Sequence, residues 1–106
     1  MEPMINHNTI MLVDKVTPHF REIRKGEVVV LKSLHDSKEF ICKRVVNVGD
    51  ETLQLENREV FIPPGFVWAE GDNKDFSFDS RHYGPMSNYL VIGIVRGTIY
   101  PEFKLI

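Results

Sequence analysis

Glu39-Phe40-Ile41-Cys42-Lys43-Arg44-Val45-Val46 is the segment whose pattern indicates the fold class most clearly. Successive side chains of a β-strand point to opposite faces, so every second residue shares a face. Ile41, Lys43 and Val45 then lie on one face, and the remaining side chains from Phe40 to Val46 lie on the other. The β-branched and aromatic content of this stretch favours a strand over an amphipathic helix.

Six further segments have the same character, because each is a short apolar block bounded by turn formers. We expect strands at residues 10–15, 27–32, 52–55, 59–62, 66–70 and 89–99, besides the strand at 39–46. Asn57-Arg58 and Pro63-Pro64-Gly65 are typical of tight turns and predict hairpins. No segment shows a clean helical period. The sequence therefore predicts an all-β fold of twisted antiparallel sheets that form a partly closed barrel.

Residues 71–87 differ from the rest of the chain, being rich in Gly, Asp, Asn, Ser and Pro with three aromatic residues between them. This composition predicts one long irregular loop. Loops of such length inside a compact domain are more often functional than not. We therefore expect this loop to contribute to a site.

Bulk composition describes one globular domain that spans residues 1–106, with 42% hydrophobic and 26% charged residues. The formal charge of −2 leaves no broad positive field, so nucleic acid is not an expected partner. Cys42 is the only cysteine, which excludes an internal disulfide. The longest apolar stretch, at residues 89–95, is interrupted by Gly93 and is far shorter than the roughly 20 residues of a spanning helix.

Lys43 is the candidate catalytic residue of the predicted strand at residues 39–46, because Ile41 and Val45 flank it on the same face. Removal of water from an ammonium group favours the neutral amine, which lowers the pKa and makes a general base near neutral pH. The alternative is structural: Lys43 lays its methylenes along the sheet while its ammonium reaches water or a carboxylate. Arg44, on the other face, is most simply a surface charge or the partner of an acidic loop residue.

Four motifs in order resemble the signature boxes of the type I signal peptidase family. Met1-Glu2-Pro3-Met4 is similar to the end of an S-M-x-P-T box, whose serine would stand just before Met1, and Gly26-Glu27-Val28-Val29-Val30 resembles G-D-I-V-V. Residues 41–50 resemble K-R-V-I-G-x-x-G-D, with Lys43 at the lysine and one residue fewer before Gly49.

The fourth motif is the most specific, since Gly71-Asp72-Asn73 followed by Ser77-Phe78-Asp79-Ser80-Arg81 matches G-D-N-x-x-x-S-x-D-S-R residue for residue. Further stretches, including residues 64–68 and 80–85, resemble the mitochondrial inner membrane protease branch of the family, subunit 1 in particular. The resemblance covers nearly the whole chain, and it implies the β fold that this family shares with self-cleaving repressor-type proteins.

The resemblance implies a Ser/Lys peptidase in which Lys43 is the general base and Ser77 hydrogen-bonds and orients its amine. Asp79 and Arg81 would form an ion pair that fixes the loop, while Asp72 and Asn73 would shape the turn that enters it. Substrate would lie along a wall that includes Met4, Ile5 and residues 10–13, although a core role for Ile10 and Leu12 is an equal alternative. The alternative for Ser77 is a loop serine that satisfies nearby backbone groups.

The serine nucleophile is absent from residues 1–106, so we expect this chain alone to be inactive and to be a truncated form whose serine and membrane anchor lie upstream. The alternative is a non-catalytic subunit or peptide-binding module of the same protease complex. The resemblance further implies a precursor-peptide substrate, a second protease subunit as partner, and a place at the intermembrane-space side of the mitochondrial inner membrane. The dyad mechanism requires no cofactor and no metal, and we expect neither.

Overall fold

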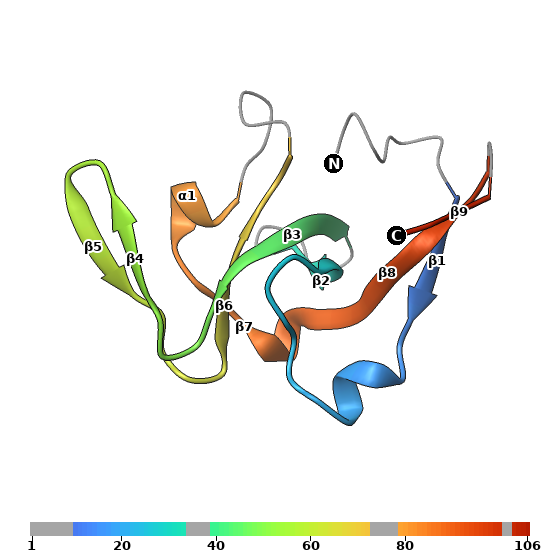
Figure 1. Ribbon diagram of the computed structural model, residues 1–106, viewed down its shortest axis with the longest axis horizontal. Coiled ribbons are helices and arrows are strands. Elements are labelled where there is room, and N and C mark those ends of the chain that lie inside the picture. Colours follow the sequence, from blue (N-terminus) through green and yellow to red (C-terminus); the bar gives the residue numbers. More distant parts are fainter. Residues whose placement is uncertain (1–9, 34–38, 73–78, 101–102) are drawn as a thin grey trace.

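The computed structural model describes residues 10–33, 39–72, 79–100 and 103–106, and most of this part of the chain is β-strand (Figure 1). Three single helical turns, η1, α1 and η3, interrupt the strands. The strands are β1 (Ile10–Asp14), β2 (Val28–Lys32), β3 (Phe40–Val48), β4 (Thr52–Leu55), β5 (Arg58–Phe61), β6 (Phe66–Glu70), β7 (Met86–Ser87), β8 (Val91–Tyr100) and β9 (Lys104–Leu105). The helical turns are η1 (Thr17–His19), α1 (Ser80–Tyr83) and η3 (Asn88–Leu90).

All strand pairs within the described part of the chain are antiparallel. The main sheet runs in the order β1-β8-β2-β3-β6-β7, with β9 also paired to β8, and β4-β5 forms a separate hairpin. The predicted antiparallel β architecture is therefore confirmed. Among the described residues no pairing joins β1 to β7, so this path is open, and a partly closed barrel stays a prediction.

Strand β2 lies at the centre of the core because both of its faces are covered. Val29 and Leu31 belong to one apolar cluster, whereas Val28 and Val30 belong to a second. An uninterrupted apolar strand is what burial on both faces requires. The first cluster also contains Ile23, Val45, Val67, Ala69, Met86 and Ile94, and the second contains Val95.

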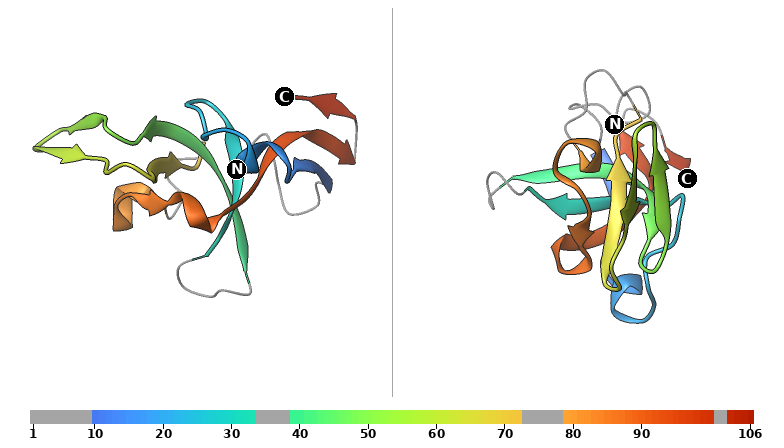
Figure 2. Two further views of the ribbon diagram at one scale, coloured as in Figure 1. Left: turned by 90° about the horizontal axis from the view of Figure 1, so that it is seen from below. Right: turned by 90° about the vertical axis from the view of Figure 1, so that its left-hand side faces the viewer.

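The turn after β3 explains why residue 49 is a glycine. A Cβ atom there would lie 3.0 Å from both the Pro63 carbonyl oxygen and the Pro64 Cα, too close for an ordinary contact. The next residue, Asp50, has a positive φ of 68°, and its amide donates to the Ile62 carbonyl at 2.8 Å. This tight crossing directs the β4-β5 hairpin away from the main sheet (Figure 2).

Three local predictions were wrong. The β4-β5 turn is at Glu56 and Asn57 instead of Asn57 and Arg58, since Leu55 pairs with Arg58. The last predicted strand begins at Val91, because residues 88–90 form η3. The predicted irregular loop contains α1 and β7 within its described residues, and a four-residue helix is too short to produce a detectable period.

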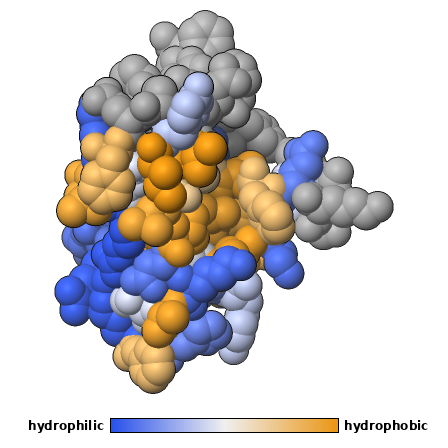
Figure 3. All heavy atoms as spheres, turned by 90° about the vertical axis from the view of Figure 1, so that its right-hand side faces the viewer, coloured by the Kyte–Doolittle hydropathy of each residue, from blue (hydrophilic) through white to orange (hydrophobic). Residues whose placement is uncertain are grey.

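Apolar side chains gather on the side of the molecule that carries β1, β8 and β9 (Figure 3). Ile10 and Leu12 are 55% and 41% exposed, so the alternative that placed them in the core was wrong. Their neighbours Met11 and Val13 pack against the second cluster instead. Among the described residues no helix has the length and apolar character needed to cross a bilayer.

Candidate active site

Lys43 lies on β3 in the apolar setting that the alternation predicts. Ile41 packs against the first core cluster and Val45 belongs to it, so the two same-face neighbours of Lys43 face the interior. Directly across the β2-β3 ladder, the partner of Lys43 is Val29, which is fully buried. The lysine stem is thus surrounded by branched apolar side chains, and Lys43 itself is half-buried.

The surroundings of Lys43 change its protonation equilibrium. Desolvation by burial is the largest effect, and it lowers the pKa of Lys43 below its ordinary value. The charge of Asp79 acts in the opposite direction, and the charge of Arg81 adds to the lowering. A lysine with a lowered pKa has a larger neutral fraction near neutral pH, which is the form that can accept a proton.

Asp79 is the most buried charged residue of the site, with a fully buried side chain at the start of α1. Its carboxylate accepts from the Arg81 amide at 3.1 Å, and a capping box completes the helix start, since the Asp79 amide donates to His82 Nδ1 at 3.3 Å. The carboxylate also accepts from the Gly71 amide at 2.8 Å. Asp79 therefore ties the beginning of α1 to the end of β6.

The Arg81 guanidinium binds the same carboxylate through two nitrogens, at 2.9 Å to Oδ1 and 2.6 Å to Oδ2. The expected Asp79–Arg81 ion pair is present, and its fork geometry is the strong form of this contact. Glu70 lies 4.0 Å from Arg81, and its carboxylate accepts from the Trp68 indole at 2.8 Å. Both charges of the buried pair are thereby held in fixed positions.

Ser80 adds a second connection between α1 and β6. Its buried hydroxyl oxygen accepts from the Ala69 amide at 2.9 Å. We call Gly71, Asp79, Ser80 and Arg81 together the loop anchor, because they fix both ends of the segment from β6 to α1. The sequence reasoning assigned no role to Ser80 or Glu70, and the only available signal was the position of Ser80 inside the matched motif.

Strand register brings the loop anchor next to Lys43. Arg44 pairs with Glu70 across the β3-β6 ladder, so continuing the register by one residue places Lys43 across from Gly71. The Gly71 amide is the one that Asp79 binds. Lys43 and the buried carboxylate therefore lie at the same end of β6, although they are 36 residues apart in the sequence.

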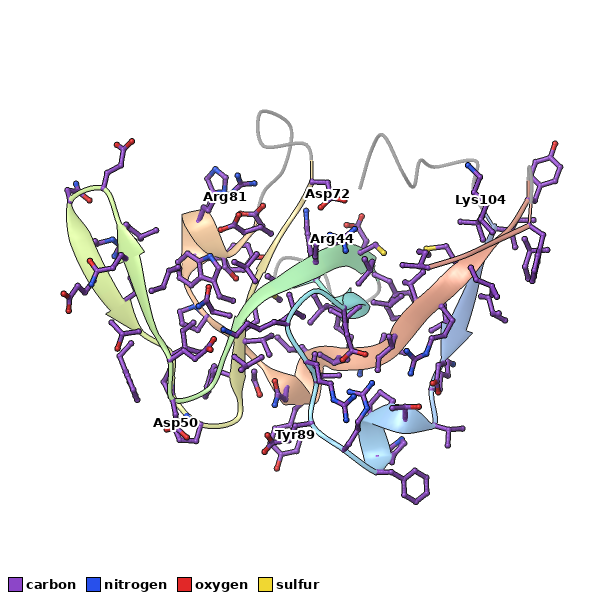
Figure 4. All side chains as sticks on the ribbon, in the orientation of Figure 1. Arg44, Asp50, Asp72, Arg81, Tyr89 and Lys104 are labelled. Atoms are coloured by element: carbon purple, nitrogen blue, oxygen red, sulfur yellow. The ribbon has the colours of Figure 1, made fainter. Side chains whose placement is uncertain are left out.

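Arg44 takes the opposite face of β3 and binds Asp72 through two contacts of 3.1 and 3.2 Å (Figure 4). Of the two alternatives for Arg44, a surface charge or the partner of an acidic loop residue, the second is the one observed. Cys42, on the same face, packs 3.8 Å from the Met11 sulfur, and burial raises its thiol pKa to about 11. A thiol with a raised pKa is a poor nucleophile.

The remaining predicted site residues, Met4, Ile5, Asn73 and Ser77, lie outside the described part of the chain. The contact predicted between Ser77 and Lys43 and the substrate wall at Met4 and Ile5 stay predictions. Of the residues expected to act together, the structure brings Lys43, Asp79 and Arg81 to one end of β6. Asp72 follows β6 there as well, bound to Arg44.

Comparison with known proteins identifies relatives of this chain. The profile of the family described as signal peptidase, peptidase S26, matches residues 1–63 and 47–100. Mitochondrial inner membrane protease subunit 1 of Mus musculus is 41% identical, over 99% of this chain and 63% of the relative, and that of Homo sapiens is 40% identical over the same shares. Subunit 2 of Danio rerio is 33% identical, over 98% of this chain and 61% of the relative.

This chain thus spans less than two thirds of the length of these relatives. Its matches cover both the strand with Lys43 and the loop anchor. The chain belongs to the signal peptidase family, peptidase S26, and its relatives include subunits of mitochondrial inner membrane proteases.

Proposed function

We propose that this chain is the catalytic domain of a Ser/Lys endopeptidase that removes sorting or signal peptides from proteins delivered to the mitochondrial intermembrane space. The observation that carries the proposal is the half-buried Lys43 among branched apolar side chains, beside the hydrogen-bonded loop anchor; burial there lowers the pKa of its amine. Burial of the ammonium costs free energy, and the neutral amine that burial favours is the form that a general base requires.

In this mechanism the neutral amine of Lys43 takes the proton from a serine hydroxyl while the serine oxygen attacks the scissile carbonyl. The Lys43 ammonium then gives that proton to the leaving amine, which leaves an acyl-enzyme. Lys43 next removes a proton from water, which hydrolyses the ester and regenerates the serine. Ser77 orients the amine, Asp72, Asn73, Asp79 and Arg81 support the loop, and Met4 and Ile5 contact the substrate.

The nucleophile is supplied by a serine outside residues 1–106, directly before Met1 in the longer protein. The same upstream region supplies the membrane anchor, and a second subunit completes a heterodimer at the intermembrane-space side of the inner membrane. The support for these points is the family membership, the share of the relatives that this chain spans, and the names of the relatives as protease subunits.

The test is cleavage of a peptide that spans a presequence cleavage site, by the 106-residue chain and by a chain extended through the residues encoded upstream. We expect turnover by the extended chain only, and its loss by at least about 100-fold in Lys43→Met, because general-base catalysis contributes roughly 10²–10⁴-fold. Lys32→Met is the matched control, since Lys32 is an exposed strand lysine at the end of β2.

Persistent turnover by the extended Lys43→Met chain would overturn the assignment of the base. Turnover by the 106-residue chain that depends on Lys43 would overturn the placement of the nucleophile. An extended chain that binds the peptide without cleaving it, and that raises the activity of the partner subunit, would favour the alternative of a non-catalytic subunit.

A further inference from the structure

The ion pair of the loop anchor joins the buried Asp79 carboxylate to the partly exposed Arg81 guanidinium, and both charges act on the Lys43 amine. Asp79 is fully buried, and its carboxylate accepts from the amide of Gly71, which directly follows Glu70, the register partner of Arg44. A buried negative charge at that place stabilises an ammonium group, which is the wrong form for a general base. The residue that anchors the loop therefore opposes the proposed chemistry, unless another charge offsets it.

Arg81 is the group that can offset it. Its guanidinium binds both oxygens of Asp79, at 2.9 and 2.6 Å, so a positive charge accompanies the carboxylate in a fixed position. Within the described part of the chain, the charges of Asp79 and Arg81 and the thiol of Cys42 act on Lys43. Arg44 points to the other face of β3 and is bound to Asp72.

We propose that Arg81 is a positioning residue by its charge as well as its geometry: its guanidinium offsets, at the Lys43 amine, the field of the carboxylate that anchors the loop. This inference rests on the proposed role of Lys43 as the general base. It assigns to the Asp79–Arg81 pair an electrostatic function, in addition to holding the segment between β6 and α1.

A merely structural role predicts a different outcome when the pair is broken. If the pair only holds the loop, removal of either partner loosens the site, lets water reach Lys43 and shifts its titration midpoint upward. If the charges act directly, removal of the two partners has opposite effects. Loss of the Arg81 guanidinium removes the positive charge bound to the carboxylate and favours the ammonium form, whereas loss of the Asp79 carboxylate removes the negative charge and favours the neutral amine.

The experiment follows the Lys43 Cε chemical shift with pH in the 106-residue chain labelled with ¹³C-lysine, with the signal assigned by its loss in Lys43→Arg. We expect the midpoint to rise in Arg81→Gln and to fall in Asp79→Asn. Nearby unit charges shift such equilibria by roughly 1–3 pKa units, so the neutral-to-charged ratio at one pH should differ about tenfold or more between the two variants.

Arg44→Gln is the matched control, because it removes a guanidinium and its ion pair from the opposite face of the same strand. We expect no rise in the midpoint for this variant. Should Arg81→Gln fail to fold, Asp79→Asn still decides the question, since asparagine can accept from the Gly71 amide and the predicted fall is opposite to the effect of loosening.

A rise or no change in Asp79→Asn would overturn the proposal, as would a rise in Arg44→Gln equal to that in Arg81→Gln. The readout is independent of peptide cleavage. Failure of the proposed peptidase function would appear instead as Lys43-independent turnover by the extended chain, with the titration results unaffected.

Discussion

Two clusters of ion pairs in this molecule each join arginine to a carboxylate, but at different depths below the surface. In the loop anchor, Arg81 binds a carboxylate whose side chain is fully buried. In a second cluster, which we call the β1–β8 cluster, Arg96 binds Asp14 at 3.0 Å and Arg21 binds Glu27 at 2.7 Å, with side chains 14–38% exposed. Depth decides what each cluster contributes. Charges near water are screened, and solvent can replace a lost partner, whereas a buried carboxylate that loses its counter-charge cannot be solvated in its place.

The largest effect is expected when the buried pair is broken. Arg81→Met leaves the Asp79 carboxylate buried without its counter-charge, and such changes cost about 3–5 kcal/mol in the free energy of unfolding. Urea denaturation at neutral pH, followed by circular dichroism, measures this cost. A loss below about 1 kcal/mol would show that Asp79 is as well solvated as the carboxylates of the β1–β8 cluster.

A smaller loss is expected from the second connection of the loop anchor. Ser80→Ala removes the acceptor of the Ala69 amide, and a buried donor without a partner costs about 1–3 kcal/mol. The matched control is Ser87→Ala, because the Ser87 hydroxyl accepts from an exposed amide, that of Tyr89, which water can satisfy. Equal losses in the two variants, by the same denaturation measurement, would remove the distinction between the buried and the exposed contact.

A smaller effect is expected on the pH dependence of the free energy of unfolding, and it comes from Lys43. The pKa of Lys43 is lower in the folded chain than in the unfolded chain, so the unfolded chain binds more protons between the two values. Stability must therefore rise with pH from the folded pKa of Lys43 up to the ordinary lysine range. We expect Lys43→Met to stabilise the chain at neutral pH and this advantage to shrink as the pH rises through the alkaline range; a constant difference in unfolding free energy would contradict it.

The smallest effect belongs to the β1–β8 cluster. Arg96→Met breaks the contacts to Asp14 and Glu27, and pairs of this exposure contribute about 0–1 kcal/mol. The change in unfolding free energy should also diminish as salt is added, because screening acts on exposed charges first. A loss as large as that of Arg81→Met would mean that depth does not separate the two clusters.

Much of the fold could be predicted from local sequence, because successive side chains of a strand point to opposite faces and pack against different apolar clusters. Ile41 and Val45 face one core cluster and Cys42 packs against the other, as the alternation predicted. Helix α1 could not be predicted from periodicity, since it is one turn held by the capping contacts of Asp79. The local sequence features of this helix are Asp79 at the N-cap and Gly84 after the last turn; in the structure Gly84 has a positive φ.

The candidate site could be predicted only where a local pattern or a matched motif reported it. Lys43 between two branched neighbours and the Asp79–Arg81 pair are of this kind. The β1–β8 cluster was missed, because Asp14 and Arg96 are brought together over 82 residues of sequence by the pairing of β1 with β8. The position of Gly71 across from Lys43 depends on the β3-β6 register, which includes an irregularity between Val45 and Asn47 that no local signal reveals.

A general base at position 43 requires that burial lowers the pKa of the Lys43 amine, and titration of this amine in the unmodified chain measures that property. The Cε shift of Lys43, recorded between neutral and strongly alkaline pH, should give a midpoint clearly below the ordinary lysine value of about 10.4. A midpoint at or above that value would mean that the ammonium is solvated or stabilised by Asp79, and position 43 would then have no basis as a general base.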